Sequence, residues 1–274
     1  MEFKAFKMDG LGNDFVIIDQ RHSQFELTKD QIKKICNRSF IGCDQLIFIK
    51  KNGKVDAYIE FYNSNGSTSG ACGNGTRCVA YLLSKEMNKD KIILGTKSAN
   101  LESKILGEKL VETKIGTAKN KWDEIPLSIE LNTSNLNYKI IDKNNKEHFG
   151  GTAVNVGNPH IVFFINNIEN FNLEKIGPKI ENDKLFPEKC NVTLAKIINE
   201  NHIKVKVWER GAGLTKACGT AACATAYAAK INGKVKNKTE IEFELGKLSI
   251  FIDESENISM SGPVSNINQI DIKI

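Results

Sequence analysis

Two cysteines with matching neighbours, Cys72 and Cys218, are the residues whose type and placement point to chemistry. Residues 71–81 read ACGNGTRCVAY, and residues 217–227 read ACGTAACATAY. In both stretches the cysteine directly precedes a glycine at a predicted helix start. Anions are favoured there, because the first backbone N–H groups of a helix have no acceptor within it and its dipole is positive at that end. Each cysteine is therefore predicted to be a reactive thiol beside an anion-binding cradle.

A pair of such thiols suits the inversion of a carbon atom next to a carboxylate. Inversion needs a base on one face of the carbon and an acid on the other, and a thiolate and a thiol supply both and exchange roles in the reverse direction. The N–H groups at the two helix starts would stabilise the charge that develops on the carboxylate. The sequence has no lysine in a pyridoxal-phosphate pattern and no GxGxxG or Walker motif, so we expect chemistry without a cofactor.

The remaining cysteines are interpreted as small buried residues of the core. They are Cys36, Cys43, Cys78, Cys190 and Cys223. The spacing from Cys72 to Cys78 is not CxxC, and the chain has only four histidines, none within a few residues of either motif. This pattern argues against zinc and against thioredoxin-like redox chemistry, and no metal site is predicted.

An internal repeat extends beyond the two cysteine motifs. Cys72 and Cys218 are 146 positions apart, and two Gly-Asn pairs, at Gly12 and Gly157, are 145 apart. Further polar positions beside predicted strands match at an offset of 146: Gln45 with Asn191, and Asn63 with Glu209. We infer a duplicated domain.

The elements that must position these residues are short strands and two buried helices. Runs such as 45–50, 57–62 and 203–208 are β-rich and bounded by turn residues, which is typical of antiparallel strands. The residues after each Cys-Gly pair change to a helical period, with Val79, Leu82 and Leu83 on one face and a small apolar run over 221–229. The predicted fold is α/β (α+β), with two pseudo-symmetric domains, each a mainly antiparallel sheet wrapped around a central helix.

The domain boundaries are predicted from the same pattern. The first domain is assigned to 1–118 with 263–274, and the second to 119–262, the last stretch returning to complete the first sheet. The polar stretch 118–126 is expected to join the halves before a strand resumes.

Composition excludes several other classes of protein. The 274 residues are 41% apolar and 26% charged, which excludes a disordered or disulfide-scaffold chain. The net charge of +5 is dispersed, so neither nucleic-acid binding nor membrane binding is expected. No signal peptide and no apolar stretch of about 18 residues is present, so a cytoplasmic protein with a small-molecule substrate is expected. The sequence leaves open whether the chain forms a homodimer.

The sequence resembles the diaminopimelate epimerase family over essentially its full length. The matching motifs are MDGLGNDF (8–15), GCDQL (42–46), FYNSNGS (61–67), ACGNGTRC (71–78), VGNPH (156–160), FPEKCNV (186–192), WERGAG (208–213) and ACGT (217–220). The resemblance implies a cofactor-independent interconversion of LL- and meso-diaminopimelate, which serves lysine and peptidoglycan synthesis. It also implies two similar domains with the active site in the cleft between them.

By position, the resemblance assigns a role to each candidate site residue. It implies that Cys72 and Cys218 are the acid/base pair, with His160 and Glu209 assisting their proton state. The reacting carboxylate would lie on Gly73, Asn74, Gly219 and Thr220. The rest of the substrate would contact Asn13, Asn63, Asn158, Asn191 and Arg210, with Arg210 on the distal carboxylate and Gln45 in support.

Simpler interpretations and other functions stay open for several of these residues. Asn13, Asn63 and Asn158 could be turn formers, and Glu209 with Arg210 an exposed ion pair. Three positions depart from the family pattern, namely Asn65, Leu214 and Ala221, and these affect the expected substrate more than the reaction. The alternative functions are another two-cysteine racemase, of the proline or hydroxyproline type, and an amino-acid-binding protein without catalysis.

Overall fold

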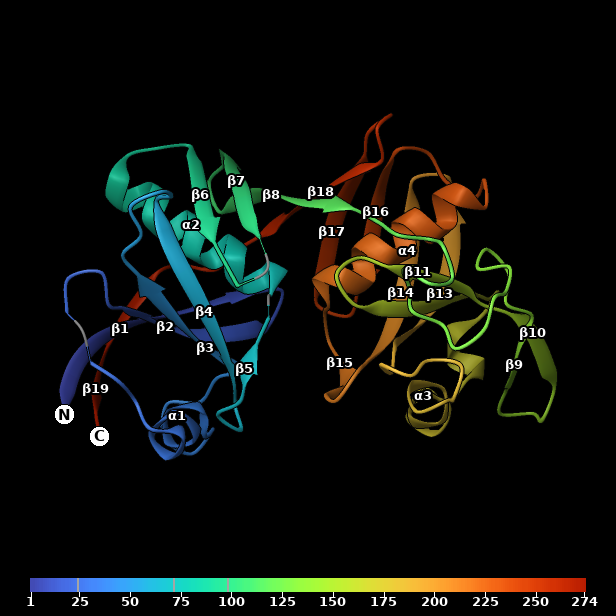
Figure 1. Cartoon of the computed structure of the whole chain (residues 1–274), viewed down its shortest axis with the longest axis horizontal. Helices are drawn as coiled ribbons and strands as arrows, with labels where there is room; N and C mark the ends of the chain where they lie inside the picture. Colours follow the sequence, from blue (N-terminus) through green and yellow to red (C-terminus); the bar gives the residue numbers. More distant parts are fainter. Residues whose placement is uncertain (24, 71, 98) are drawn as a thin grey trace. The chain divides into compact units, whose positions relative to one another are not determined.

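The computed structural model describes residues 1–23, 25–70, 72–97 and 99–274. The chain divides into two compact units. Unit 1 comprises Met1–Lys114 and Ser261–Ile274, and unit 2 comprises Ile115–Met260. Both are mixed α/β structures with more strand than helix (Figure 1).

Unit 1 consists of a curled sheet and two helices. Its strands are β1 (Glu2–Gly10), β2 (Asn13–Asp19), β3 (Gln45–Lys50), β4 (Ala57–Asn63), β5 (Thr68–Ser69), β6 (Lys91–Gly95), β7 (Asn100–Gly107), most of β8 (Leu110–Thr117) and β19 (Asn268–Lys273). Its helices are α1 (Lys29–Cys36) and α2 (Gly73–Met87). β19 pairs antiparallel with β1, with Glu2 opposite Lys273, so the end of the chain completes this sheet.

Unit 2 repeats the pattern and adds a hairpin. Its strands are β9 (Tyr138–Ile141), β10 (Glu147–Gly150), β11 (Thr152–Asn155), β12 (Pro159–Phe164), β13 (Asn191–Asn199), β14 (His202–Glu209), β15 (Gly213–Thr215), β16 (Lys238–Phe243), β17 (Gly246–Ile252) and most of β18 (Asn257–Pro263). Its helices are η1 (Ile168–Asn170), α3 (Leu173–Glu181) and α4 (Gly219–Ile231). β9 and β10 pair only with each other among the described strands.

The two sheets follow the same pairing rules. In unit 1 the pairs β1–β2, β3–β4, β4–β5 and β6–β7 are antiparallel, and β2–β3 and β4–β6 are parallel. In unit 2 the pairs β11–β12, β13–β14, β14–β15 and β16–β17 are antiparallel, and β12–β13 and β14–β16 are parallel. The helices follow equivalent strands in both. The inferred duplication and the mainly antiparallel sheets are confirmed.

The helix that follows each Cys-Gly pair is the central helix of its unit. Residues 74–84 of α2 are buried, and α2 packs on the strands of unit 1 (Figure 1). Helix α4 is buried along nearly its whole length, because its sequence GTAACATAYAAKI presents small residues on every side. Small side chains allow the surrounding strands to approach the helix axis closely, which explains why α4 shows no amphipathic pattern.

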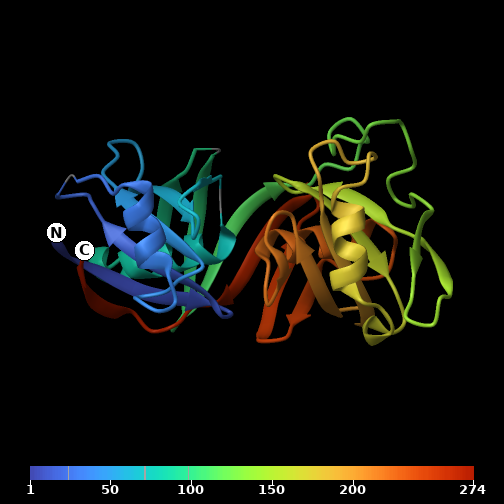
Figure 2. The same ribbon diagram turned by 90° about the horizontal axis from the view of Figure 1, so that it is seen from below.

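A second helix in each unit lies on the sheet and carries one apolar face. Helix α1 begins with a capping box between Thr28 and Gln31, and it buries Ile32 and Ile35. Helix α3, yellow in Figure 2, packs on β13, β14 and β15 of unit 2. In this helix Gly177 lies directly against Trp208, since a Cβ at that position would be 2.5 Å from the indole ring.

One expectation about the fold is wrong. The chain does not resume a strand directly after 118–126. Apart from an isolated bridge between Lys119 and Asn155, residues 118–137 form turns and irregular structure, and the next strand is β9. Apolar side chains within this stretch, including Trp122, Ile125 and Leu127, pack into the core of unit 2 instead of pairing in a sheet. Within the described residues, no helix has both the length and the apolar character to span a membrane.

Candidate active site

Cys72 and Cys218 occupy the same position in equivalent helices. Each is the N-cap residue, Cys72 of α2 with φ −146° and ψ 111°, and Cys218 of α4 with φ −142° and ψ 117°. The predicted helix starts are therefore confirmed, although Ala71, the first residue of the repeated motif, lies outside the described residues. Neither side chain caps its helix, so both sulfurs stand beside a helix start where anions are favoured.

Cys218 is buried, with 6% of its surface exposed, among groups that act on its proton. Burial raises the pKa of the Cys218 thiol well above its usual value, and the negative charge of Glu209, which hydrogen-bonds to the thiol, raises it further. The Thr220 hydroxyl, 3.4 Å from the sulfur, and the Ala221 backbone N–H lower the pKa. The raising effects win, so Cys218 rests as a thiol with a carboxylate as its neighbour.

This environment predicts how fast Cys218 is alkylated. The thiolate is the reactive form, so at pH 8 iodoacetamide should modify Cys218 more slowly than an exposed cysteine. Glu209→Gln removes the charge that raises the pKa, so the Cys218 thiolate fraction, and with it alkylation at pH 8, should rise several-fold.

The measurement is residue-specific labelling followed by peptide mass spectrometry. Glu200→Gln is the control, because Glu200 is an exposed residue paired with Lys236. Unchanged or slower alkylation of Cys218 in Glu209→Gln would show that Glu209 does not hold the thiol in its protonated form.

Cys72 is half-buried and lies among amide side chains of unit 1. Its sulfur is 3.6 Å from Oδ1 of Asn13, the first residue of β2. The same oxygen accepts a hydrogen bond of 3.3 Å from Nδ2 of Asn74, in the first turn of α2. A thiol S–H can donate to this amide oxygen, so the three side chains form one polar group at the helix start.

Gln45 and Asn63 form a second polar pair in unit 1. Gln45 begins β3 and Asn63 ends β4, and the antiparallel register places them opposite each other. Nε2 of Gln45 donates to Oδ1 of Asn63 at 3.0 Å, and Nδ2 of Asn63 donates to Oγ of Ser67 at 3.0 Å. Asn63 is thus both a turn residue and a member of a hydrogen-bonded amide pair.

Three candidate residues meet at the start of β12 and β13 in unit 2. His160, on β12, is fully buried, and its Nε2 lies 2.8 Å from Oδ1 of Asn158 and 3.5 Å from Nδ2 of Asn191. An amide oxygen only accepts, so Nε2 carries the ring proton and donates it to Asn158. Among the described residues nothing pairs with the buried Nδ1 of His160.

The buried histidine is neutral. Burial, helped by the positive charge of Arg210, lowers the pKa of His160 to about 3. Across the neutral pH range its Nδ1 is therefore an acceptor and not a donor. A capped surface histidine, the simpler interpretation of His160 from its place after a proline, is excluded by its complete burial.

Arg210 follows the end of β14, in a turn held by its backbone. Its N–H donates to Oδ1 of Asn191 at 3.0 Å, and its Nη1 donates to the carbonyl oxygen of Glu188 at 2.7 Å. The side chain itself is exposed. The neighbouring Glu209 hydrogen-bonds to the Cys218 thiol.

Two residues of the site were not predicted from the sequence. Asp44 accepts a hydrogen bond of 2.9 Å from Nδ2 of Asn13, which leaves Oδ1 of Asn13 directed towards Cys72. Arg77 is fully buried in α2 and donates from Nη2 to Oδ1 of Asn74 at 2.8 Å. Both lie within the quoted motifs, and a charged residue in a helix otherwise expected to be buried was the available signal for Arg77.

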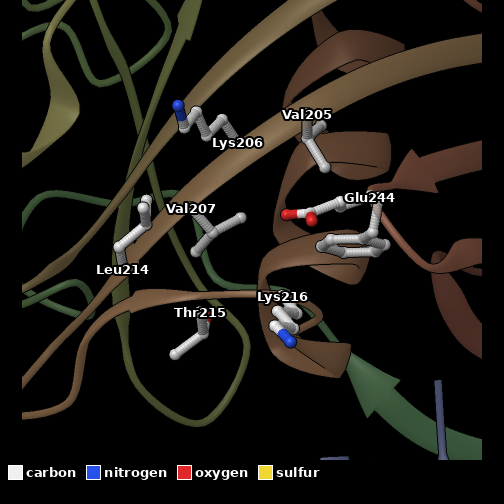
Figure 3. Close-up of a pocket in the computed structure, with 8 residues that line it drawn as sticks. Val205, Lys206, Val207, Leu214, Thr215, Lys216 and Glu244 are labelled. Atoms are coloured by element: carbon white, nitrogen blue, oxygen red, sulfur yellow. The ribbon is translucent and has the colours of Figure 1, made fainter. Parts of the chain in front are cut away.

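The three departures from the family pattern lie in different surroundings. Ala221 is fully buried and directs its backbone N–H to Cys218, whereas the Asn65 side chain accepts from the Ser67 N–H in an exposed turn. Leu214 is 40% exposed. It lines a small surface pocket that contains none of the candidate site residues (Figure 3), formed by Val205, Lys206, Val207, Leu214, Thr215, Lys216, Phe243 and Glu244. Over the described part of the chain, no three His, Cys, Asp or Glu residues are placed to hold a metal ion.

Solved structures share this duplicated fold at low sequence identity. A hydroxyproline epimerase from Agrobacterium vitis matches with a TM-score of 0.68 and 10% identity, covering 99% of this chain and 91% of its own. That likeness concerns the fold. Together, the two equivalent units with a thiol at each central helix start have the fold class of the epimerases and racemases.

Sequence comparison identifies the family within this class. The family profile described as diaminopimelate epimerase matches residues 5–121 and 152–267. A diaminopimelate epimerase from Pelagibacter ubique is 69% identical over 274 residues, which is 100% of both chains. One from Caulobacter vibrioides is 40% identical over 269 residues, covering 94% of this chain and 93% of its own. The chain belongs to the diaminopimelate epimerase family.

Proposed function

We propose that this protein interconverts LL- and meso-diaminopimelate by moving a proton between two thiols and one α-carbon. The observation that carries the proposal is the placement of Cys72 and Cys218 as N-caps of equivalent helices in a chain of this family. Each thiol serves one face of the α-carbon, and the helix-start N–H groups near Gly73 and Gly219 stabilise the enolate charge on the carboxylate. The chain's own residues perform every step, and no cofactor takes part.

The proton state of Cys218 sets the order of events in this proposal. Cys218 rests as a thiol, so it is the acid when the proton is removed from the opposite face. When it acts as the base, its proton passes first to the hydrogen-bonded Glu209. Neutral His160 fixes the Asn158 amide through its Nε2–H, which leaves the Nδ2 of Asn158 to bind substrate.

The remaining candidate residues recognise a substrate with two ammonium and two carboxylate groups. Amide side chains both donate and accept, which suits such a substrate. In this proposal Asn74 and Thr220 complete the carboxylate cradle, and Arg210 binds the distal carboxylate. Amide contacts come from Asn13, Asn63, Asn158 and Asn191, with Gln45 holding Asn63. We also propose that the two epimerase domains are 1–118 with 263–274 and 119–262; a cytoplasmic location stays a prediction.

The test is proton exchange in D₂O with the purified chain under reductant. Proton NMR should show deuterium entering one α-position of LL-diaminopimelate while the meso isomer forms. Exchange with proline or hydroxyproline, but not with diaminopimelate, would support the two-thiol chemistry and identify a different substrate. No exchange with any amino acid would favour a binding protein.

A further inference from the structure

A buried carboxylate lies behind the turn that carries Glu209 and Arg210. Glu181, the last residue of α3, is only 6% exposed, and each of its oxygens accepts one hydrogen bond. Oε2 accepts from the indole Nε1 of Trp208 at 2.7 Å, and Oε1 accepts from the backbone N–H of Gly211 at 3.0 Å. Trp208 directly precedes Glu209 in the chain, and Gly211 directly follows Arg210.

The turn has few other constraints of its own. Gly211 adopts φ +75°, a left-handed conformation, and the Ala212 N–H donates to the Glu209 carbonyl at 3.1 Å. The Arg210 N–H is held by Asn191. Nη1 of Arg210 also donates to the Glu188 carbonyl at 2.7 Å. Because Glu181 accepts from the residues at both ends of the turn, it holds the backbone from which Glu209 and Arg210 project.

The packing around Glu181 makes this contact rigid. Trp208 lies on α3 so closely that Gly177 has no room for a side chain, since a Cβ would be 2.5 Å from the ring. A buried carboxylate is costly unless donors satisfy it, and its hydrogen bonds are stronger than those of neutral acceptors. An apolar residue could fill the space but would leave the Trp208 and Gly211 donors without this acceptor.

We infer that Glu181 is a positioning residue for substrate recognition, holding Arg210 where it binds the distal carboxylate of the substrate. The inference rests on the proposed function, because it assigns Arg210 the role proposed there. Glu181 acts through the turn 208–211 and does not touch the substrate.

Glu181→Gln is the test, and Asp183→Asn is its matched control. A glutamine keeps the shape but turns an N–H₂ group towards one of the two donors, so one hydrogen bond is lost. Asp183, two residues on, also accepts from an aromatic side chain, the Tyr138 hydroxyl at 2.6 Å, and from a backbone N–H, that of Leu185 at 2.9 Å. Neither of its two donors is a candidate site residue.

The kinetic constants separate positioning from folding. A misplaced Arg210 weakens the binding of the substrate and of the transition state by similar amounts. Glu181→Gln should therefore raise KM about tenfold while kcat falls by less than about threefold. Partial unfolding alone would lower kcat at constant KM. Asp183→Asn should leave KM within about twofold of wild type even if both variants lose similar thermal stability.

Amide hydrogen exchange supplies a readout that needs no substrate. Exchange at Gly211 should be faster in Glu181→Gln by at least about tenfold and unchanged in Asp183→Asn. Unchanged KM in Glu181→Gln, or an equal rise in both variants, would overturn the inference while the epimerase function stands. A wild-type chain without epimerase activity would overturn the proposed function, and the role of Glu181 with it.

Discussion

Replacing either Cys72 or Cys218 with alanine is expected to reduce epimerisation of diaminopimelate at least about 10³-fold. Inversion requires that a proton leave one face of the α-carbon and that another arrive on the opposite face. Each variant lacks the group for one of these transfers. The helix starts keep their N–H groups in both variants, so substrate binding should weaken far less than turnover.

The two variants should differ in which diastereomer still exchanges its α-proton. Each keeps one thiol, which can remove a proton from the face it serves and return deuterium to that same face. One variant should therefore incorporate deuterium into LL-diaminopimelate without forming the meso isomer, and the other should exchange only the D-centre of the meso isomer. Proton NMR in D₂O measures both. Loss of exchange with both isomers in both variants would speak against independent bases.

Matched controls are present in the same two helices. Cys78 in α2 and Cys223 in α4 are fully buried, and neither is at the helix start. Cys78→Ala and Cys223→Ala each remove a sulfur from the helix that carries a reactive thiol, and they should keep kcat within about threefold of wild type. A comparable loss of activity in these controls would attribute the effect to packing.

The sequence predicted the repeat and the helix starts because both depend on local signals. Each Cys-Gly pair and the helical period that follows it lie within one stretch of about a dozen residues, and the two stretches can be compared directly. The equivalence of Gln45 with Asn191 also follows from the sequence, and each begins the third strand of its sheet. The strand expected after 118–126 does not form, because Leu127, the first apolar residue after that stretch, packs into the core without pairing in a sheet.

Other features could not be predicted because they depend on residues far apart in the chain. Asp44 accepts a hydrogen bond from Asn13, which is 31 positions away in the sequence, and Glu181 accepts one from Gly211, which is 30 positions away. The low pKa of His160 arises from complete burial, which its neighbours in the sequence do not reveal. The family resemblance predicted which residues form the site, and the structure adds the hydrogen bonds that hold their side chains.

Arg210→Met should lower kcat/KM for diaminopimelate by about 10²- to 10³-fold, chiefly through KM. A guanidinium can bind a carboxylate with two parallel hydrogen bonds, and methionine keeps similar length without donors. The turn should survive the change, because the Arg210 backbone N–H still donates to Asn191 and the Gly211 N–H to Glu181. Arg210→Lys keeps the positive charge but cannot form two parallel hydrogen bonds to a carboxylate. Its kcat/KM should therefore lie between those of wild type and Arg210→Met.

L-lysine separates distal recognition from chemistry at the α-carbon, because it is diaminopimelate without the distal carboxylate. If Arg210 binds that carboxylate, Arg210→Met should lose its preference for diaminopimelate while any slow α-proton exchange of lysine stays at the wild-type rate. Equal losses with both substrates would place Arg210 at the reacting centre instead. If Arg210→Met turned over diaminopimelate within about threefold of the wild-type rate, Arg210 would not be a substrate-binding residue, because losing a bidentate charge-assisted pair should cost more than that factor.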